Sequence, residues 1–327
     1  MFHNTPSAGF LLPSVHRVLL SSCCKLCSPR SISTISTRPV PLAAASLAGS
    51  PEHFLSFASS SESTPLLLAH PSVPSESNSS RSAGLLRALR NGDDRLVDVE
   101  LGRYDDTAPG AFDRMPMRLG QYLDWLESNG GSGGKVGGQQ VYLAQWRGTD
   151  EIPAVKQLVR PPPILEPLLS GNHADLYQTS FFVGPTGAIT PLHYDPYMNL
   201  YHLHASSDPL THAKHFTLLP PSVSEFVRRA DGHASLRNTS AIDLQLRPRS
   251  GGSNLQFDIL TDSCPTRSAD ALSLSALSCV LREGETLFIP RGWWHRVENV
   301  LLPGRGLSSA SAGWTAGIGW WFLLRQP

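Results

Sequence analysis

The chain has 327 residues, with 27 basic and 27 acidic side chains and therefore a formal net charge of zero. This balance gives no support for a polyanionic partner such as a nucleic acid, and no apolar run approaches the ~20 residues that a membrane-spanning helix needs. The 27 glycines and 27 prolines favour turns and short strands over long helices. The five cysteines are scattered and odd in number, which argues against a disulfide framework.

The N-terminal part of the chain differs in composition from the rest. The first 51 residues contain no Asp or Glu, and among many serines they carry four basic residues, Arg17, Lys25, Arg30 and Arg38. This composition is typical of a mitochondrial targeting peptide; the alternative is a disordered tail on a protein of the cytoplasm or nucleus. Residues 52–82 are rich in serine and proline, which predicts a linker outside the core. The folded domain is therefore expected at 83–327.

Helical and strand patterns alternate in the first part of this domain. Helices are predicted where apolar residues recur at i, i+3 and i+4, and strands where apolar and polar residues alternate. The predicted elements are, in order, helix 84–90, strand 97–101, helix 117–128, strand 141–146 and helix 152–158. A Gly/Ser-rich stretch at 129–138 predicts a flexible loop.

Short strands dominate from residue 177 onward. A helix is predicted at 220–229, and strands are predicted at 177–183, 189–194, 199–204, 214–219, 276–281, 286–289 and 314–323. The stretch 231–274 is mostly polar, which predicts a long surface loop or disorder. Many short strands with Gly/Pro turns indicate a sandwich or barrel. A jelly roll suits best, because it brings a mid-chain strand and a late strand together around one cavity.

A metal-binding pattern lies in the segment Thr190–Pro196, and the distant His295 completes it. Side chains at i and i+2 of an extended strand point to the same face, so His193 and Asp195 project together while Tyr194 points away. Two histidines and one carboxylate form the set that binds a non-haem Fe(II) on one face and leaves the other face open. These residues therefore predict an oxygen-activating iron centre.

The segments around this pattern carry a family resemblance. Residues 97–323 resemble a JmjC domain of the small JmjC-only hydroxylase type, within the cupin-like 2-oxoglutarate oxygenases, and residues 1–90 lie outside the resemblance. The nearest known group is the arginyl-hydroxylase-like one, also described as lysine demethylase 8-like. The matching segments come in the family's order: Val97–Gly102, Tyr142–Gln145, Phe182–Gly187, Thr190–Asn199, Lys214–Phe216, Asn238–Ser240 and Gly284–His295. The resemblance implies a mainly β fold, a double-stranded β-helix (jelly roll) with flanking helices.

The resemblance also implies a role for each matching residue. The implied iron ligands are His193, Asp195 and His295. Lys214 matches the lysine that pairs with the distal carboxylate of 2-oxoglutarate, a role that suits a long ammonium side chain in an apolar cavity. The implied hydrogen-bonding partners of that cosubstrate are Tyr142, Thr190 and Asn199. Fe(II), 2-oxoglutarate and O2 are the implied cofactors, and a protein is the implied substrate.

Two departures from the family pattern bear on the cosubstrate. The turn after Asn199 is usually tight in relatives, whereas the stretch 202–213 here predicts a longer loop that could move Lys214. On the last strand, relatives often carry an inward serine where this chain has Ala316. Both departures concern the cosubstrate residues and leave the iron ligands untouched.

Several functions stay open at this level. Hydroxylation of a protein side chain is the leading expectation, with arginine first by resemblance. Histone lysine demethylation and hydroxylation of a modified tRNA base are alternatives within the same family, although the zero net charge counts against the tRNA base. A catalytically inactive cupin-like binding module is the alternative from another class. The sequence specifies neither the substrate nor the oligomeric state, because specificity in such folds lies in the loops at the barrel mouth.

Overall fold

The computed structural model describes residues 32–68, 79–129, 135–136, 139–228, 236–249, 257–262, 266–302 and 313–325. The first 31 residues, which include most of the segment that resembles a targeting peptide, lie outside these ranges, as does most of the predicted Gly/Ser loop. Within the described part of the chain, no helix is long and apolar enough to cross a membrane.

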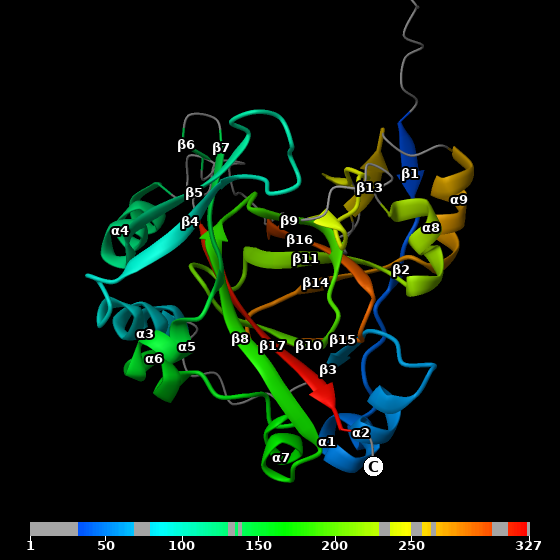
Figure 1. The fold of residues 1–327 in the computed structure, drawn as a ribbon, viewed down its shortest axis with the longest axis horizontal. Helices are drawn as coiled ribbons and strands as arrows, with labels where there is room; N and C mark the ends of the chain where they lie inside the picture. Colours follow the sequence, from blue (N-terminus) through cyan, green and yellow to red (C-terminus); the bar gives the residue numbers. More distant parts are fainter. Residues whose placement is uncertain are drawn as a thin grey trace, which may run out of the picture. The chain divides into compact units, whose positions relative to one another are not determined.

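Two antiparallel sheets form the predicted jelly roll (Figure 1). One contains the strand order β15-β10-β17-β8, formed by Thr286–Ile289, Met198–Ser206, Trp314–Leu324 and Ala174–Pro185. The other contains the order β14-β11-β16-β9, formed by Leu277–Leu281, His212–Leu219, Trp294–Leu301 and Ile189–Tyr194. An apolar cluster with members from both sheets fills the space between them, where the Tyr201 and Phe216 rings lie edge to face with 5.1 Å between centroids. The fold class expected from the sequence is confirmed.

The larger sheet continues past β8 through strands on the N-terminal side. The order β8-β7-β4-β5 adds Gln139–Trp146, Leu96–Gly102 and Phe112–Arg118, and the short strand β6 (Lys135–Val136) pairs with β7. Both predicted strands in this region are confirmed, and β5 is an addition. It pairs with β4 along its whole length, which aligns Glu100 with Arg114.

Helices cover the outer face of the larger sheet, as Figure 1 shows for α3 (Ser79–Arg90), α4 (Leu119–Asn129) and α6 (Pro153–Leu158). The predicted helical stripe on α4 is buried, and its Tyr122 hydroxyl donates to the carbonyl of Val183 at 2.6 Å. The remaining helices are short: α1 (Ala45–Gly49), α5 (Gly148–Glu151), α7 (Glu166–Ser170), η1 (Pro221–Val223) and α8 (Ser224–Val227).

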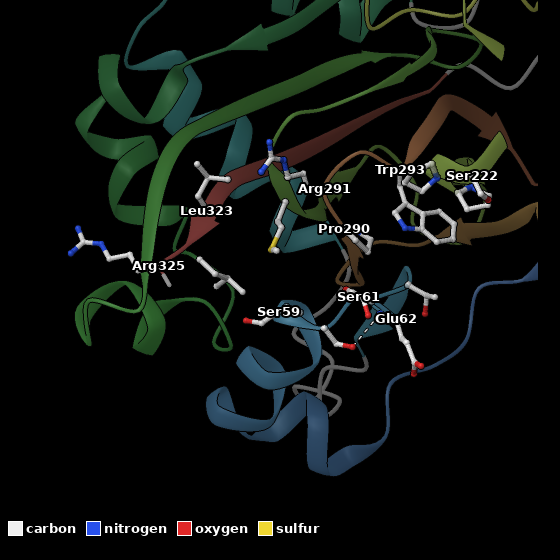
Figure 2. Close-up of a pocket in the computed structure, with 17 residues that line it drawn as sticks. Ser59, Ser61, Glu62, Ser222, Pro290, Arg291, Trp293, Leu323 and Arg325 are labelled. Atoms are coloured by element: carbon white, nitrogen blue, oxygen red, sulfur yellow. Dashed lines mark hydrogen bonds between the residues drawn. The ribbon is translucent and has the colours of Figure 1, made fainter. Parts of the chain in front are cut away.

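The predicted linker at 52–82 contains part of the core. Helix α2 (Pro51–Ser59) buries Phe54 completely, edge to face on Phe288 with 5.0 Å between ring centroids. Strand β3 (Leu66–Leu68) then pairs with β15. Residues 58–64 also line a pocket of about 990 Å³, and Figure 2 labels Ser61, Glu62 and Pro290 among its lining residues. Serine-rich composition concealed these few apolar residues, whose burial depends on partners that are distant in sequence.

The predicted long loop at 231–274 is also partly ordered. It contains β12 (Gln245–Pro248), β13 (Phe257–Thr261) and helix α9 (Thr266–Ser275). These strands join β1 (Ser33–Ile35) in a three-stranded sheet, while β2 (Arg38–Pro39) pairs with β14. The prediction of a loop at 231–274 was wrong because β13 is short and pairs with β1, which lies in the N-terminal segment where no folded structure was predicted.

The predicted loop at 202–213 is mostly strand. Strand β10 runs to Ser206 and β11 begins at His212, which leaves only five residues between them. The strand predicted at 199–204 extends by two residues to Ser206, and its His202 and His204 line a pocket on the outer side. The structure therefore gives Lys214 a regular place on β11, opposite Leu281 and Asn299.

Candidate active site

Three of the predicted residues converge at the ends of two adjacent strands. His193 on β9 and His295 on β16 are register partners, with ring centroids 4.2 Å apart. The carboxylate of Asp195, just beyond β9, lies 4.0 Å from Nε2 of His193 and 3.6 Å from Nε2 of His295. One ligand atom from each residue lies within 4.8 Å of the other two. The predicted same-face placement is confirmed, and Tyr194 points away to pack on Trp294.

The two imidazoles are held in the orientation that metal binding requires. Nδ1 of His193 lies 2.8 Å from the carbonyl oxygen of Pro191, and Nδ1 of His295 lies 3.0 Å from that of Trp293. Because a carbonyl only accepts, each Nδ1 carries the proton and donates it, which leaves an Nε2 lone pair facing Asp195. Burial, together with the neighbouring His193, lowers the pKa of His295 to about 4, so this ring is neutral at pH 7. Two imidazoles with Nε2 toward the same point and one carboxylate fit a ferrous ion.

The carboxylate is fixed from the opposite sheet. Nε1 of Trp321 donates to Oδ2 of Asp195 at 2.7 Å, and the backbone N–H of Gly292 donates to the Asp195 carbonyl at 3.0 Å. Gly292 has a φ of +78°, which a glycine adopts without strain. From the sequence, no role in the site was predicted for Trp321. The bond to Asp195 could be found only from the fold, because 126 residues separate the two.

The stretch Asn238–Ser240 borders the centre. Its Ser240 N–H donates to the Leu192 carbonyl at 2.7 Å, and the Asn238 carbonyl accepts from Tyr194 at 2.9 Å. This pairing occupies the free edge of β9. The strand that carries His193 and Asp195 is therefore held on both sides.

A buried ammonium lies in the barrel interior. Lys214 is fully buried, and its Nζ donates to Oδ1 of Asn299 at 2.6 Å and to the hydroxyl of Tyr142 at 3.3 Å. Burial lowers the pKa of Lys214 to about 7. Asn299 in turn donates to the carbonyls of Gly184 and Pro185, both at 2.9 Å. Sequence reasoning missed Asn299, although alternation on β16 places residues 295, 297 and 299 on one face.

The other predicted cosubstrate residues lie in the same interior. The hydroxyl of Tyr142 hydrogen-bonds the side chain of Thr190, and burial raises the pKa of Tyr142. Asn199 and Tyr201 are buried, and the side-chain oxygen of each has no hydrogen-bond partner in the described part of the chain. Buried polar atoms are nearly always paired, so these two indicate a place for a polar ligand.

Ala316 does not occupy the inward position that the family comparison suggested. It packs in the outer cluster beneath the helices. Thr315 shares the inner face with Gly317 and Trp321, and its hydroxyl is buried. Ala316 shares its face with Trp314, Ile318 and Trp320, which belong to the same outer cluster, so regular alternation along β17 places it outward. The alanine therefore does not count against a cosubstrate site.

A cavity of about 620 Å³ opens beside the three metal-binding candidates. Tyr104, Gln145 and Asn238 line it together with His193 and Asp195. Gln145 has a φ of +56°, a left-handed conformation that a non-glycine residue adopts at a cost of about 1 kcal/mol or more. A strained residue at this position indicates a functional constraint on the mouth of the cavity.

An ion pair lies at the same mouth. Nη2 of Arg114, which lines the cavity, lies 3.0 Å from the carboxylate of Glu100. The Arg114 side chain is 55% exposed, whereas that of Glu100 is 6% exposed. Burial raises the pKa of Glu100, and the guanidinium opposes that shift. At the mouth of the cavity, the guanidinium of Arg114 is therefore paired with the buried carboxylate of Glu100.

Comparisons with known proteins agree with this arrangement. A family profile described as a cupin-like domain matches residues 74–323. The chain is 27% identical over 208 residues to the Lysine-specific demethylase JMJ30 of Arabidopsis thaliana, an alignment that covers 64% of this chain and 41% of that protein. It is 25% identical over 212 residues to the Jumonji C domain-containing protein 5 of Drosophila melanogaster, covering 64% and 46%. It is also 25% identical over 206 residues to the Lysine-specific demethylase 8 of Xenopus tropicalis, covering 62% and 38%.

The chain spans less than half the length of these relatives. The profile nevertheless covers most of the chain, and the matched region contains every predicted site residue. The chain belongs to the cupin-like domain family, as a JmjC-type member.

Proposed function

We propose that this protein is an Fe(II)- and 2-oxoglutarate-dependent oxygenase that hydroxylates a protein side chain. JmjC members of the family use Fe(II), 2-oxoglutarate and O2. The observation that carries the proposal is one interior that holds both the His193, Asp195 and His295 cluster and the buried Lys214. Either feature alone has structural explanations. A metal-ligand set beside an ammonium that has no carboxylate partner among the described residues fits a chelating dicarboxylate.

In this proposal His193, Asp195 and His295 hold the iron. When bound, the metal supplies the oxidation, in which substrate C–H, O2 and 2-oxoglutarate give C–OH, succinate and carbon dioxide. The two Nδ1 donations keep the histidine lone pairs aimed at the metal, and Trp321 keeps the carboxylate in place.

The buried residues orient the cosubstrate. Lys214 pairs with its distal carboxylate, and Asn299 fixes the direction in which the ammonium points. Tyr142, Thr190 and Asn199 supply hydroxyl and amide groups within the same space. The apolar cluster between the sheets excludes water from the cosubstrate.

Arginine is the side chain that we propose as substrate. Support comes from the resemblance of the matching segments, Thr190–Asn199 and Gly284–His295 among them, to the arginyl-hydroxylase-like group. Lysine demethylation is the second candidate, and the observation in its favour is that two of the relatives bear the name lysine-specific demethylase. Both reactions use the same centre, and they differ in the product.

The first experiment separates an oxygenase from a binding module. Fe(II) and 2-oxoglutarate are added to the purified chain without oxygen, the visible metal-to-ligand charge-transfer band is recorded, and succinate is assayed after oxygen is admitted. We expect the band and slow succinate formation. A folded protein that binds neither Fe(II) nor 2-oxoglutarate would overturn the proposal in favour of the binding module.

The second experiment identifies the substrate class by mass. Matched peptides that carry arginine, lysine or methylated lysine at one position are incubated with the reconstituted enzyme, beside a tRNA pool. Arginine hydroxylation adds one oxygen to the peptide, whereas demethylation removes a methylene. Turnover of only the methylated lysine, or only the tRNA, would replace arginine as the proposed substrate and leave the oxygenase proposal intact.

A further inference from the structure

A second pocket lies on the opposite side of the larger sheet from the iron-binding candidates. Its volume is about 800 Å³, which is within the range of small-molecule sites. Its floor consists of His202 and His204 on β10 and Trp320 on β17. A strap of three prolines at 161–163 and the segment around Gly49 and Pro51 form its rim.

Strand alternation separates this pocket from the barrel interior. Tyr201 and Trp321 point into the barrel, whereas their neighbours His202 and Trp320 point outward into the pocket. None of the residues proposed to hold iron or 2-oxoglutarate lines it. The pocket is therefore independent of the proposed catalytic centre.

The charges around the pocket are predominantly positive. Arg81 on α3 and Arg160 before the proline strap contribute two guanidinium groups, against the single carboxylate of Glu166. Neither arginine forms an ion pair within 4 Å in the described part of the chain. Glu283, the acid that Arg81 influences over a longer distance, instead accepts from the Ser206 N–H and hydroxyl.

The floor offers polar contacts without competing charge. Burial and the nearby Arg81 lower the pKa of His204 to about 4, so this ring is neutral at pH 7. His202 contacts the Trp320 ring at 6.5 Å between centroids, and its Nδ1 lies 2.9 Å from the Thr286 hydroxyl. The Trp320 indole, the neutral His204 imidazole and the proline strap form a surface for a flat ligand.

We propose that this pocket binds a small amphipathic anion, with an apolar or aromatic body and one acidic group. The body lies against Trp320 and the proline strap, and the acidic group faces Arg81. Charge complementarity selects the anion: a cation would meet two guanidinium groups, and a neutral molecule would leave the Arg81 charge without a partner. Arg160 is more exposed and contributes less, because solvent screens it.

The test uses the purified full chain and two matched fluorescent probes. 8-Anilinonaphthalene-1-sulfonate carries a sulfonate, and N-phenyl-1-naphthylamine has the same rings without it. Binding of each is titrated to wild type, Arg81→Gln, Arg81→Lys and Arg87→Gln. Arg87 lies on the same helix and is exposed outside the pocket, so it is the control for a general loss of surface charge. Saturating 2-oxoglutarate with Fe(II) is present in a parallel set, because Lys214 also attracts anions.

We expect saturable binding of the sulfonate at one site, weakened about tenfold by Arg81→Gln, restored in part by Arg81→Lys and unchanged by Arg87→Gln. The uncharged probe should bind wild type and Arg81→Gln equally. Three results would overturn the proposal: no saturable binding to the folded protein, equal loss in the Arg87→Gln control, or displacement of the sulfonate by 2-oxoglutarate.

Discussion

Strands β10 and β17 have two faces whose side chains differ in polarity. The inner face carries Asn199, Tyr201 and Trp321; Nε1 of Trp321 donates to Asp195, and the buried side-chain oxygens of the other two have no partner in the described part of the chain. The outer face carries Leu200 and Phe322, which are fully buried against helices. At these positions the inner surface is the one proposed to meet the cosubstrate and the outer surface packs the core, while His202 and Trp320 of the outer face line the second pocket.

This difference explains how the barrel tolerates a polar interior. A buried polar group without a partner costs about 1–3 kcal/mol, and a buried ammonium costs more. The outer face, with its continuous apolar cluster beneath α2, α3 and α4, offsets that cost. Substitutions on the inner face should therefore change ligand binding first, and substitutions on the outer face should change the free energy of unfolding first.

The largest effect is expected at the iron ligands. His193→Ala should reduce succinate formation by about a thousandfold or more and abolish stoichiometric Fe(II) binding, because two ligands cannot hold the ion in place. The barrel should stay folded, as circular dichroism would show. His173→Ala is the control, since this histidine is exposed and lies away from the centre. Wild-type turnover in His193→Ala would refute the ligand assignment.

A smaller and more selective effect is expected for Lys214→Met. The affinity for 2-oxoglutarate should fall about a hundredfold, because a dicarboxylate would enter the cavity without its counter-ion. Fe(II) binding should change little. Isothermal titration of 2-oxoglutarate and of Fe(II), with the exposed Lys156→Met as control, measures both. An equal loss of iron and 2-oxoglutarate would mean that Lys214 supports the fold and not the cosubstrate.

The lowered pKa of Lys214, about 7, predicts a pH dependence of cosubstrate binding. Only the protonated amine pairs with a carboxylate, and 2-oxoglutarate stays fully ionised between pH 6 and 9. The affinity should therefore be highest below pH 7 and fall by up to about tenfold per pH unit above it, until the raised pKa of the complex is reached. Titrations in this range on wild type and Lys214→Met test the prediction, which fails if both show the same slope.

The same residue predicts the sign of a stability change. Its folded pKa lies below its unfolded value of about 10.4, so the unfolded chain binds more protons between pH 7 and 10. The free energy of unfolding without cosubstrate should rise with pH across that window, by up to about 1.4 kcal/mol per unit from this group. Urea unfolding at several pH values measures the slope. Lys214→Met should remove that contribution.

The sequence predicts more of the side-chain positions on the inner face than on the outer face. The i, i+2 rule places His193 beside Asp195, and alternation on β16 would have added Asn299. Both depend only on local strand geometry. The bond from Trp321 to Asp195 and the packing of Phe54 on Phe288 join segments far apart in the chain. No local pattern carries that information, which is why residues 52–82 resembled a linker.

Register shifts set a second limit. The family comparison matched Ala316 to an inward serine, whereas regular alternation along β17 places Ala316 outward with Ile318 and Trp320. The irregularity between Leu203 and Ala205 lies on β10, where Leu203 packs in the inner cluster and Ala205 in the outer one. A single extra residue of this kind cannot be found from the alternation of apolar and polar residues alone.

The smallest predicted effect comes from comparing two adjacent residues of β10, Tyr201 on the inner face and Leu200 on the outer face. Tyr201→Phe removes a hydroxyl that is buried without a partner in the described part of the chain, and it keeps the ring that lies 6.0 Å from the Lys214 ammonium. The free energy of unfolding should therefore stay equal or rise by about 1 kcal/mol, while the affinity for 2-oxoglutarate falls a few-fold.

Leu200→Ala, on the outer face, should instead lower the free energy of unfolding by about 3 kcal/mol and leave that affinity unchanged. Urea unfolding and 2-oxoglutarate titration of both variants decide the matter. A destabilised Tyr201→Phe would show that the hydroxyl serves the fold, and the inner face would then lose its distinction as a surface kept for a ligand.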